Sequence, residues 1–527
     1  MFIKVLLLVI FFAITIAVGL YCRKHGTNVS SFVLGGRSVG PWLTAFAYGT
    51  SYFSAVVFVG YAGQFGWRFG ISATWIGLGN AIIGSLMAWV IFGRRTRIMT
   101  QHLGSATMPE FFGARFNSKN LKMVASIIVF VFLIPYTASL YNGLSRLFAM
   151  AFHVDFWICI VIMAVLTAVY VIAGGYVATA INDFIQGIIM IIGIVAVIGA
   201  VLAANGGLMA SLDSLARVPA GAGTETPGIF ASFLGPDPIN LLGVVILTSL
   251  GTWGLPQMVQ KFYAIKSEKA INKGTIISTI FAIFIAGGCY FLGGFGRLFS
   301  NIAEVRADGG IIYDSIIPSM VSGFSDLLIG VVIVLVMAAS MSTLSSLVMA
   351  SSSTLTLDLI KGNIAKKMNE KKQVFVIRVL IAVFVVISAA IAILQYNKNV
   401  VFIAQLMGVS WGALAGSFLA PFLYGLYWKR TTKVAVWINM AFGSLFMITN
   451  FMTSVGVLPK SIFPVILQSP INAGAFTMLF GLILVPVISL LTPKPDKGHV
   501  NKCFSCYDKD SVQSALDQDG VKRLPDN

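Results

Sequence analysis

Residues 336–353 read VMAASMSTLSSLVMASSS, which is as apolar as a membrane helix and yet carries a row of hydroxyl side chains. We call this segment the hydroxyl stretch. The residues that share or adjoin one of its faces at helical spacing are Ala339, Ser342, Thr343, Ser345 and Ser346. Several hydroxyls and a freed carbonyl that converge on one point suit a hard cation such as sodium, because such ions bind oxygen atoms. The same pattern is also typical of small residues that let membrane helices approach closely, with the hydroxyls bonded to their own helix.

The composition of the whole chain agrees with a membrane setting. The chain has 527 residues, of which 57% are hydrophobic and 10% charged, and its mean hydropathy is +0.89. Apolar runs long enough to cross a bilayer recur from end to end, so we expect an all-α polytopic membrane protein. The first run, residues 3–22, is longer than the core of a signal peptide and lacks a small-residue cleavage site, which indicates a true membrane helix.

The apolar runs predict thirteen membrane spans. They cover residues 3–22, 41–66, 72–93, 123–150, 155–174, 180–204, 239–264, 273–298, 326–357, 374–395, 398–427, 434–455 and 472–492. With this arrangement, most of the 36 lysines and arginines fall in connections on one side of the membrane. By the positive-inside rule that side is cytoplasmic, which places the N-terminus outside and the C-terminus inside a plasma membrane. We therefore attribute the net charge of +17 to topology and not to nucleic-acid binding.

Two of the predicted spans contain helix breakers. Residues 49–54 read GTSYFS in the second span, and residues 251–256 read GTWGLP in the seventh. Proline frees a carbonyl group, and freed groups are tolerated at membrane depth where they line a cavity or bind a ligand. The two spans stand first in two consecutive sets of five, as in a transporter built from inverted repeats with its site at the midplane. Two ordinary glycine-kinked helices are the alternative.

This pattern divides the chain into six regions. These are an N-terminal helix and linker (1–40), a first five-helix repeat (41–205), an external loop (206–238), a second five-helix repeat (239–430), two accessory helices (431–492) and a cytoplasmic tail (493–527). The external loop is long and contains glycine, so we expect it to cover the external mouth of the bundle. The tail is polar and bounded by prolines, which predicts a flexible segment.

An acidic side chain, Asp183, lies near the start of the sixth predicted span. An ionised carboxylate next to lipid is expensive, so Asp183 should face the bundle interior and a cation. We find no basic residue at that depth of any predicted span, and expect the hydroxyl stretch as the neighbour and sodium as the cation. Asp183 as a helix N-cap at the cytoplasmic interface is the alternative.

Other classes of function find little support in the sequence. The connections carry no nucleotide-binding glycine loop, metal cluster or nucleophile elbow, so we do not expect an enzyme. Cys503 and Cys506 form a lone CxxC, for which an incidental tail motif is favoured over a zinc site. A membrane sensor or channel on the same scaffold is a further alternative, but no signalling domain follows the last span. We also expect no obligatory oligomer and no nucleic-acid partner.

Several ordered motifs resemble the sodium:solute symporter family. They are LGGRSVGPW (34–42), AGGYVATAINDFIQG (173–187), LGTWGLPQMVQKFYAIK (250–266) and AASMSTLSS (338–346). The resemblance runs from about residue 30 to residue 430. It implies a LeuT-type fold, which consists of two inverted repeats of five helices each. In this chain one extra helix precedes the repeats and two follow them. Within the family, the segments MPEFF, PYTAS, GLPQ and MSTLS are most similar to the bacterial sodium/proline branch.

The resemblance also implies two sites for the coupling ion Na⁺. In the family one sodium ion is held by carbonyls of the first broken helix and by a carbonyl and two hydroxyls of the eighth repeat helix. The matching residues here are Thr50, Phe53, Ala339, Ser342 and Thr343. Some members hold a second sodium ion between an aspartate and serines, which match Asp183, Ser342, Ser345 and Ser346. Two sodium ions per transport cycle are thus expected.

We expect a small organic solute to bind between the two broken helices. The residues expected around it are Ser54, Phe58, Tyr136, Trp253, Pro256, Gln257 and Gln405. The first expectation is sodium-driven import of proline or a similar small amino acid across the lipid bilayer. A monocarboxylate, a pantothenate-like acid, a sugar and sialic acid are alternatives. The chain departs from the proline branch at Tyr52, where that branch has aspartate, and at Thr248, where it has tryptophan, and Tyr136 replaces the arginine of a sialic-acid member.

Overall fold

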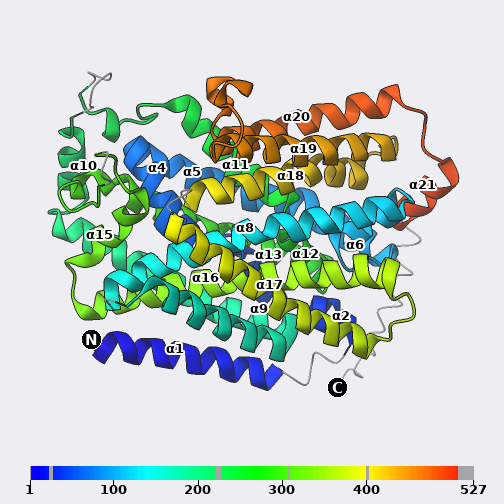
Figure 1. Cartoon of the computed structure of the whole chain (residues 1–527), viewed down its shortest axis with the longest axis horizontal. Coiled ribbons are helices and arrows are strands. Elements are labelled where there is room, and N and C mark those ends of the chain that lie inside the picture. The colour runs from blue at the N-terminus through cyan, green and yellow to red at the C-terminus, as the bar shows by residue number, and fades with distance from the viewer. Residues whose placement is uncertain are drawn as a thin grey trace.

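The structure of the protein is a computed structural model, which describes residues 2–22, 28–152, 154–219, 227–305, 309–398 and 403–508. These residues form a nearly all-helical bundle in which the long helices run side by side (Figure 1). Within these ranges the extended pairings are two isolated bridges, Val39 with Ile265 and Val305 with Ile311.

The helices are numbered in chain order. The α-helices are α1 (Phe2–Tyr21), α2 (Val29–Leu34), α3 (Pro41–Thr50), α4 (Ala62–Phe69), α5 (Thr74–Gly79), α6 (Arg94–His102), α7 (Met108–Arg115), α8 (Lys119–Phe152), α9 (Phe156–Ala204), α10 (Leu208–Ala216), α11 (Pro238–Gly254), α12 (Pro256–Ala264), α13 (Glu268–Ala282), α14 (Gly288–Gly294), α15 (Ile316–Ser322), α16 (Asp326–Thr354), α17 (Glu370–Lys398), α18 (Ile403–Tyr427), α19 (Lys433–Ser454), α20 (Pro470–Leu491) and α21 (Lys497–Phe504). Wider π-helical turns occur at Val56–Tyr61, Asn80–Met87, Trp89–Gly93, Ile283–Gly287 and Leu355–Ile364.

Many of these helices are long enough to cross a membrane. The described part of the chain has 10 such helices, or 11 if the bent pair α11 and α12 counts as one span. Two of them far exceed the roughly 20 residues that a bilayer requires. One runs over 47 residues from Val56 to His102, and the other is α9 with 49 residues. Each contains a glycine at positive φ, Gly70 at 64° and Gly175 at 60°, where an L side chain is disfavoured.

The two predicted interruptions are confirmed. Helix α3 ends at Thr50, and regular helical structure resumes at Ala55. Helix α11 ends at Gly254, Leu255 is extended, and α12 leaves at an angle of 46°. Close packing explains the glycine in α11, since a Cβ at Gly254 would lie 2.7 Å from the Cα of Ala415 on α18.

Helices α16 and α18 form the centre of the bundle. Every residue of α16 from Leu335 to Thr354 is buried, which includes the whole hydroxyl stretch. Helices α8 and α9 pack against α16, while α19 and α20 pack against α18 (Figure 1). The N-terminal helix α1 lies at the edge, against α9 and α16. The hydroxyl stretch is therefore held inside the protein and away from lipid.

The two ends of the bundle carry different elements. Helices α10 and α15 gather at one end, whereas α2, α6 and α21 lie at the other (Figure 1). The start of α1 belongs to the first end, where the Lys4 ammonium lies 2.9 Å from the Asp326 carboxylate. The external loop 206–238 contains α10, and its residues 220–226 lie outside the described part.

The prediction of a flexible tail is wrong for its first part. Helix α21 packs on α6 and α7. His499 Nε2 lies 3.0 Å from the carbonyl oxygen of Ala114, and the Arg115 guanidinium lies 4.9 Å from the Phe504 ring centroid. Burial lowers the pKa of Arg115 to about 10. Residues 509–527 of the predicted tail lie outside the described residues.

Candidate functional site

The break after α3 and the middle of α16 bring a group of oxygen atoms together, which we call the oxygen cluster. It consists of the carbonyls of Thr50, Phe53 and Ala339 and the hydroxyls of Ser342 and Thr343. Ser342 Oγ lies 3.2 Å from the Thr50 carbonyl oxygen and 3.1 Å from that of Ala339. Thr343 Oγ1 lies 3.1 Å from Thr50 O, 3.3 Å from Phe53 O and 3.0 Å from Ala339 O. The five residues matched to the first sodium site thus lie around one point.

The oxygen cluster has more acceptors than donors. A helix end leaves carbonyl groups without intrahelical partners, and α3 ends at Thr50. Each hydroxyl carries one proton, so Thr343 can donate to one of its three neighbouring carbonyls at a time. The remaining lone pairs converge on the same buried point. A cation that binds neutral oxygens would use them.

Other hydroxyls of the stretch follow the alternative pattern of bonding to their own helix. Ser340 donates to the Val336 carbonyl at 2.7 Å, and Ser345 donates to the Ser342 carbonyl at 2.8 Å. The two patterns therefore coexist on α16. Ser342 combines them, since its hydroxyl also lies 2.9 Å from the Ala338 carbonyl oxygen of its own helix.

Asp183 lies deep in the bundle, two turns beyond the break at Gly175 in α9. Its side chain is fully buried, and neither carboxylate oxygen accepts a hydrogen bond from the described residues. The helix-cap alternative is wrong, because Asp183 lies in the interior of a helix and not at its first turn.

The expectation that no basic residue lies beside the hydroxyl stretch is also wrong. Lys261, on α12, is 3% exposed, and its Nζ lies 3.0 Å from Ser346 Oγ. The same ammonium lies 5.1 Å from the Tyr176 ring centroid. Sequence analysis grouped Lys261 with the basic cytoplasmic connections. The bend at Leu255 carries α12 back into the bundle, where all of its residues are buried.

The serines matched to the second sodium site therefore contact different groups. Ser342 belongs to the oxygen cluster, and Ser345 donates to its own helix. Ser346 contacts Lys261 and also lies 2.6 Å, oxygen to oxygen, from Ser51 in the break after α3. A basic group thus occupies part of the surroundings that the sequence assigned to sodium alone.

A second cluster, of aromatic rings, lies beside the break after α3. The Trp411 ring is 5.5 Å from Tyr52 and 5.9 Å from Tyr136, centroid to centroid. The Tyr52 hydroxyl donates to the Thr248 carbonyl at 3.0 Å, so the two departures from the proline branch touch. Sequence reasoning missed Trp411, whose one signal is a tryptophan among small residues in GVSWGALAG. Gly251 makes room for it, since a Cβ there would lie 2.7 Å from its ring.

Several buried polar atoms in this region have no hydrogen-bond partner among the residues described. They are the Tyr136 hydroxyl, the Trp411 indole nitrogen and both side-chain amide atoms of Gln257. Unsatisfied buried groups are costly, and at a binding site a ligand or water commonly supplies the partner. These atoms mark positions where a polar solute would gain hydrogen bonds.

The remaining residues expected at the solute site have varied surroundings. Ser54 and Phe58 line a small cavity beside Phe53 and Ala339, next to the oxygen cluster. Pro256 is buried at the start of α12, and Gln405 is half-buried near the start of α18. Trp253 is already engaged in packing. Its indole N–H donates to the Ile83 carbonyl at 2.9 Å, and its ring lies 5.4 Å from Phe92.

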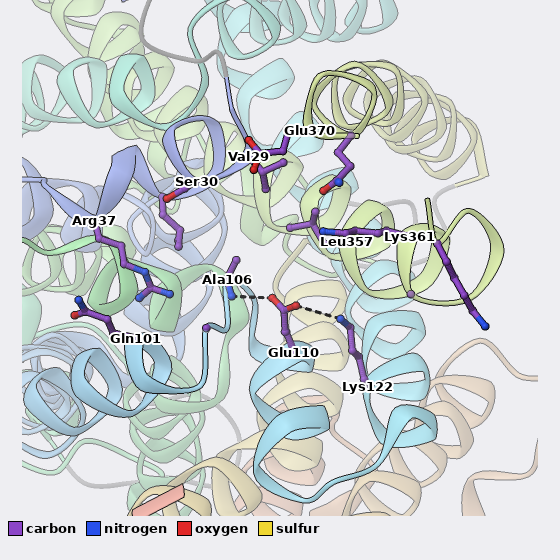
Figure 2. A pocket seen from close by; sticks show the side chains of 15 residues that line it. Val29, Ser30, Arg37, Gln101, Ala106, Glu110, Lys122, Leu357, Lys361 and Glu370 are labelled. Atoms are coloured by element: carbon purple, nitrogen blue, oxygen red, sulfur yellow. Dashed lines mark hydrogen bonds and ion pairs between the residues drawn. The ribbon is translucent and has the colours of Figure 1, made fainter. Parts of the chain in front are cut away.

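A separate cavity of about 420 Å³ lies at the end of the bundle that holds α2 and α6 (Figure 2). Two of the charged side chains that line it, Glu110 and Lys122, form an ion pair. Glu110 accepts from the Ala106 backbone N–H at 2.8 Å and lies 3.3 Å from the Lys122 ammonium, as Figure 2 shows. Lys122 also lies 3.1 Å from Asp358, whose carboxylate accepts a hydrogen bond from Thr107. This network ties the far end of the α16 span to α7 and α8.

Comparisons with known proteins bear on this arrangement. A model of the sodium:solute symporter family matches residues 32–443. Sodium/proline symporters of Staphylococcus aureus strains JH9 and COL are 31% identical over 453 residues, which cover 84% of this chain and 85% of theirs. A solved structure of a Na⁺-coupled sialic acid symporter, in a substrate-bound outward-open state, aligns with a TM-score of 0.70 at 16% identity. The alignment covers 94% of this chain and 99% of that one, and it shows a shared fold.

Proposed function

The chain belongs to the sodium:solute symporter family, and we propose that this sodium-coupled symporter imports proline or a similar small amino acid. Family membership makes it a multi-pass membrane transporter and not an enzyme. The 31% identity to sodium/proline symporters supports proline as the first solute to test. The observation that carries the proposal is the oxygen cluster, because coupling requires a sodium site inside the bundle.

We assign the oxygen cluster as the sodium site. Thr50, Phe53 and Ala339 would supply carbonyl oxygens, and Ser342 and Thr343 would supply hydroxyls. Support comes from the oxygen distances of 3.0–3.3 Å around Thr343 and from the surplus of acceptors. The cluster joins α16 to the break after α3, so sodium bound there would hold the two elements together. Such an ion stabilises the conformation in which both elements meet.

We place the solute between the two broken helices, around Tyr52, Tyr136, Gln257 and Trp411. The aromatic faces suit an apolar ring such as that of proline, and the unpaired Tyr136 hydroxyl and Gln257 amide suit its polar groups. Ser54 and Phe58 connect this region with the oxygen cluster. We place three further residues at the periphery of the solute site, namely Trp253, Pro256 and Gln405.

One observation favours a different solute within the same family. Tyr52 and Thr248 replace an aspartate and a tryptophan of the proline branch, and they contact each other at 3.0 Å. Because both changes alter one wall of the proposed pocket, a monocarboxylate, a pantothenate-like acid, a sugar or sialic acid belongs in the same binding test as proline.

We further propose the LeuT-type architecture of two inverted five-helix repeats within thirteen spans. The breaks at Gly70 and Gly175 support this count, since each divides an overlong helix in two. The broken spans then begin the repeats at 41–205 and 239–430. Placing α6 and α21 in the cytoplasm puts the N-terminus outside, because α1 starts at the opposite end of the bundle (Figure 1).

Thermal stabilisation of the purified protein tests this function. A ligand stabilises the folded state it binds, so sodium should raise the melting temperature, and proline should raise it further only when sodium is present. A panel of the alternative solutes, with potassium chloride as the salt control, identifies the solute class. Stabilisation by a solute in potassium alone would contradict sodium coupling.

A further inference from the structure

We propose that the lysine-rich connection between the α16 span and α17 binds the headgroup of an anionic phospholipid, and that phosphatidylglycerol has the chemistry that fits it best. The connection comprises residues 361–372 and lies at the end of the bundle that holds α2 and α6. This site is separate from the sodium and solute sites, so the inference goes beyond the proposed function. It requires only that the chain crosses a membrane, as members of its family do.

The connection concentrates positive charge. It contains a single acidic residue, Glu370, and five lysines, all of them exposed, namely Lys361, Lys366, Lys367, Lys371 and Lys372. Within the described ranges, none of these ammonium groups forms an ion pair with a carboxylate. Like charges so close together repel one another, and an anionic headgroup at the membrane surface relieves the repulsion.

The chain of the connection surrounds an open hollow of about 570 Å³, which we call the lysine hollow. It is lined by Ile364, Ala365, Lys366, Lys367, Met368, Asn369 and Lys372. Hydrogen bonds fix its shape. The Ala365 N–H donates to the Ile360 carbonyl at 2.8 Å, and the Lys372 N–H donates to Asn369 Oδ1 at 2.9 Å at the start of α17. Three ammonium groups thus border a space that can hold a phosphate.

The lysine hollow adjoins the cavity of about 420 Å³ that Figure 2 shows, because Lys366 lines both. The ion pair between Glu110 and Lys122 uses one charge of each sign in this cavity. The other charged side chains that line it are one acidic and three basic ones, namely Glu370, Arg37, Lys361 and Lys366. Figure 2 shows Arg37 and Lys361 on opposite sides of the cavity. The excess of positive charge favours an anion in this space.

A buried amide in the same cavity distinguishes between anionic headgroups. Gln373 is 2% exposed, and its Nε2 donates to the Met368 carbonyl at 2.7 Å. Its Oε1 also lies buried but accepts no hydrogen bond from the described part of the chain. An unpaired buried acceptor is costly, and a hydroxyl of a ligand would satisfy it. The glycerol headgroup of phosphatidylglycerol carries such hydroxyls, whereas phosphatidic acid offers its phosphate alone.

Helix α17 offers an apolar path for the acyl chains. Phe375, Val379, Val383 and Val386 are 42–66% exposed and follow one another at spacings of three or four residues. They therefore form one stripe along the helix, which begins a single turn beyond Lys371. Ammonium groups at the start of a helix and an apolar stripe below them match the two parts of a phospholipid. Free phosphate would use only the ammonium groups.

Lipid binding to the purified full-length protein tests the proposal. Native mass spectrometry counts the lipids retained from equal amounts of phosphatidylglycerol, phosphatidic acid and phosphatidylcholine. The melting temperature is measured with each lipid and with inorganic phosphate at the same concentration. Lys361→Gln/Lys366→Gln removes two ammonium groups that line the cavity. Lys269→Gln/Lys273→Gln is the matched control, since it removes the same charge from two exposed lysines of α13.

We expect the wild type and the control to retain phosphatidylglycerol in preference to phosphatidylcholine, and phosphatidylglycerol to raise their melting temperature. A lysine beside anionic lipid strengthens binding about fivefold, so Lys361→Gln/Lys366→Gln should lower the affinity for phosphatidylglycerol by about 25-fold. Gln373→Leu removes the unpaired acceptor and keeps the lysines. It should therefore reduce the preference for phosphatidylglycerol over phosphatidic acid, while phosphatidic acid still binds.

Three results would overturn the proposal. The first is equal retention of phosphatidylglycerol and phosphatidylcholine by the wild type. The second is an equal loss of affinity in the two double variants, because general surface charge would then explain the binding. The third is an equal rise in melting temperature with inorganic phosphate, because the site would then bind the ion alone. If Lys361→Gln/Lys366→Gln cannot be purified, Lys361→Gln takes its place, with an expected loss of about fivefold. An unchanged lipid preference in Gln373→Leu would refute the assignment of a glycerol headgroup.

Discussion

The hydroxyl of Thr343 is the group whose removal tests the sodium site best. Its Oγ1 lies 3.0–3.3 Å from the carbonyl oxygens of Thr50, Phe53 and Ala339. Thr343→Ala removes one ligand oxygen and leaves the three carbonyls in place. The change should not weaken the helix, because alanine has a higher helix propensity than threonine.

The expected loss can be estimated from the energy of a buried polar contact. A buried partner left unsatisfied costs about 1–3 kcal/mol, which corresponds to a fall in sodium affinity of about 5- to 150-fold. The sodium concentration for half-maximal uptake should rise accordingly. Uptake at saturating sodium should fall much less, because the solute contacts lie on other residues.

Sodium titration of solute uptake in reconstituted vesicles measures this effect. Ser340→Ala is the matched control, since its hydroxyl donates to the Val336 carbonyl of the same helix at 2.7 Å. Thr343→Ser keeps an oxygen and should retain most of the sodium affinity. Unchanged sodium dependence in Thr343→Ala, or an equal shift in Ser340→Ala, would refute the assignment.

Three further predictions concern other parts of the structure. Tyr136→Phe removes a buried hydroxyl without a protein partner and should weaken solute binding by about 2- to 10-fold. Solute titrations at saturating sodium measure this affinity. An unchanged affinity would mean that the solute binds elsewhere. Lys122→Gln leaves buried Asp358 without its ammonium partner and should lower the free energy of unfolding by about 3 kcal/mol, as measured by denaturant titration. An unchanged free energy of unfolding would mean that the Asp358 carboxyl is uncharged. Burial raises the pKa of Cys506 to about 12 and raises that of Cys503 above its ordinary value, which keeps both thiols protonated at pH 7. Maleimide should label them slowly in the folded protein and quickly after denaturation, and rapid labelling at pH 7 would contradict the packing of α21.

Features with a local sequence signal could be predicted. Glycine and proline inside apolar runs located both interruptions, at residues 49–54 and 251–256. Hydroxyls at helical spacing located the face of α16 that meets the first break. Both signals depend on residues within one or two helical turns, which is the range over which a sequence determines backbone conformation.

Features that depend on packing between distant segments could not be predicted. Lys261 looked like a loop residue, because its burial depends on the 46° bend between α11 and α12 and on contacts with α16. Trp411 reaches Tyr52 and Tyr136 because Gly251 on another helix lets it approach. Helix α21 is ordered by contacts with Ala114 and Arg115 that lie far away in the sequence. A polar composition alone therefore predicted flexibility there.

The central claim is that a sodium gradient drives solute accumulation. The most direct measurement is uptake of labelled proline, and of the alternative solutes, by vesicles that contain the purified protein and carry an inward sodium gradient. The account predicts that at least one of these solutes accumulates above its external concentration, and that accumulation disappears when a sodium ionophore dissipates the gradient. Accumulation of the same size under a potassium gradient, or no accumulation of any of these solutes under a sodium gradient, would contradict it.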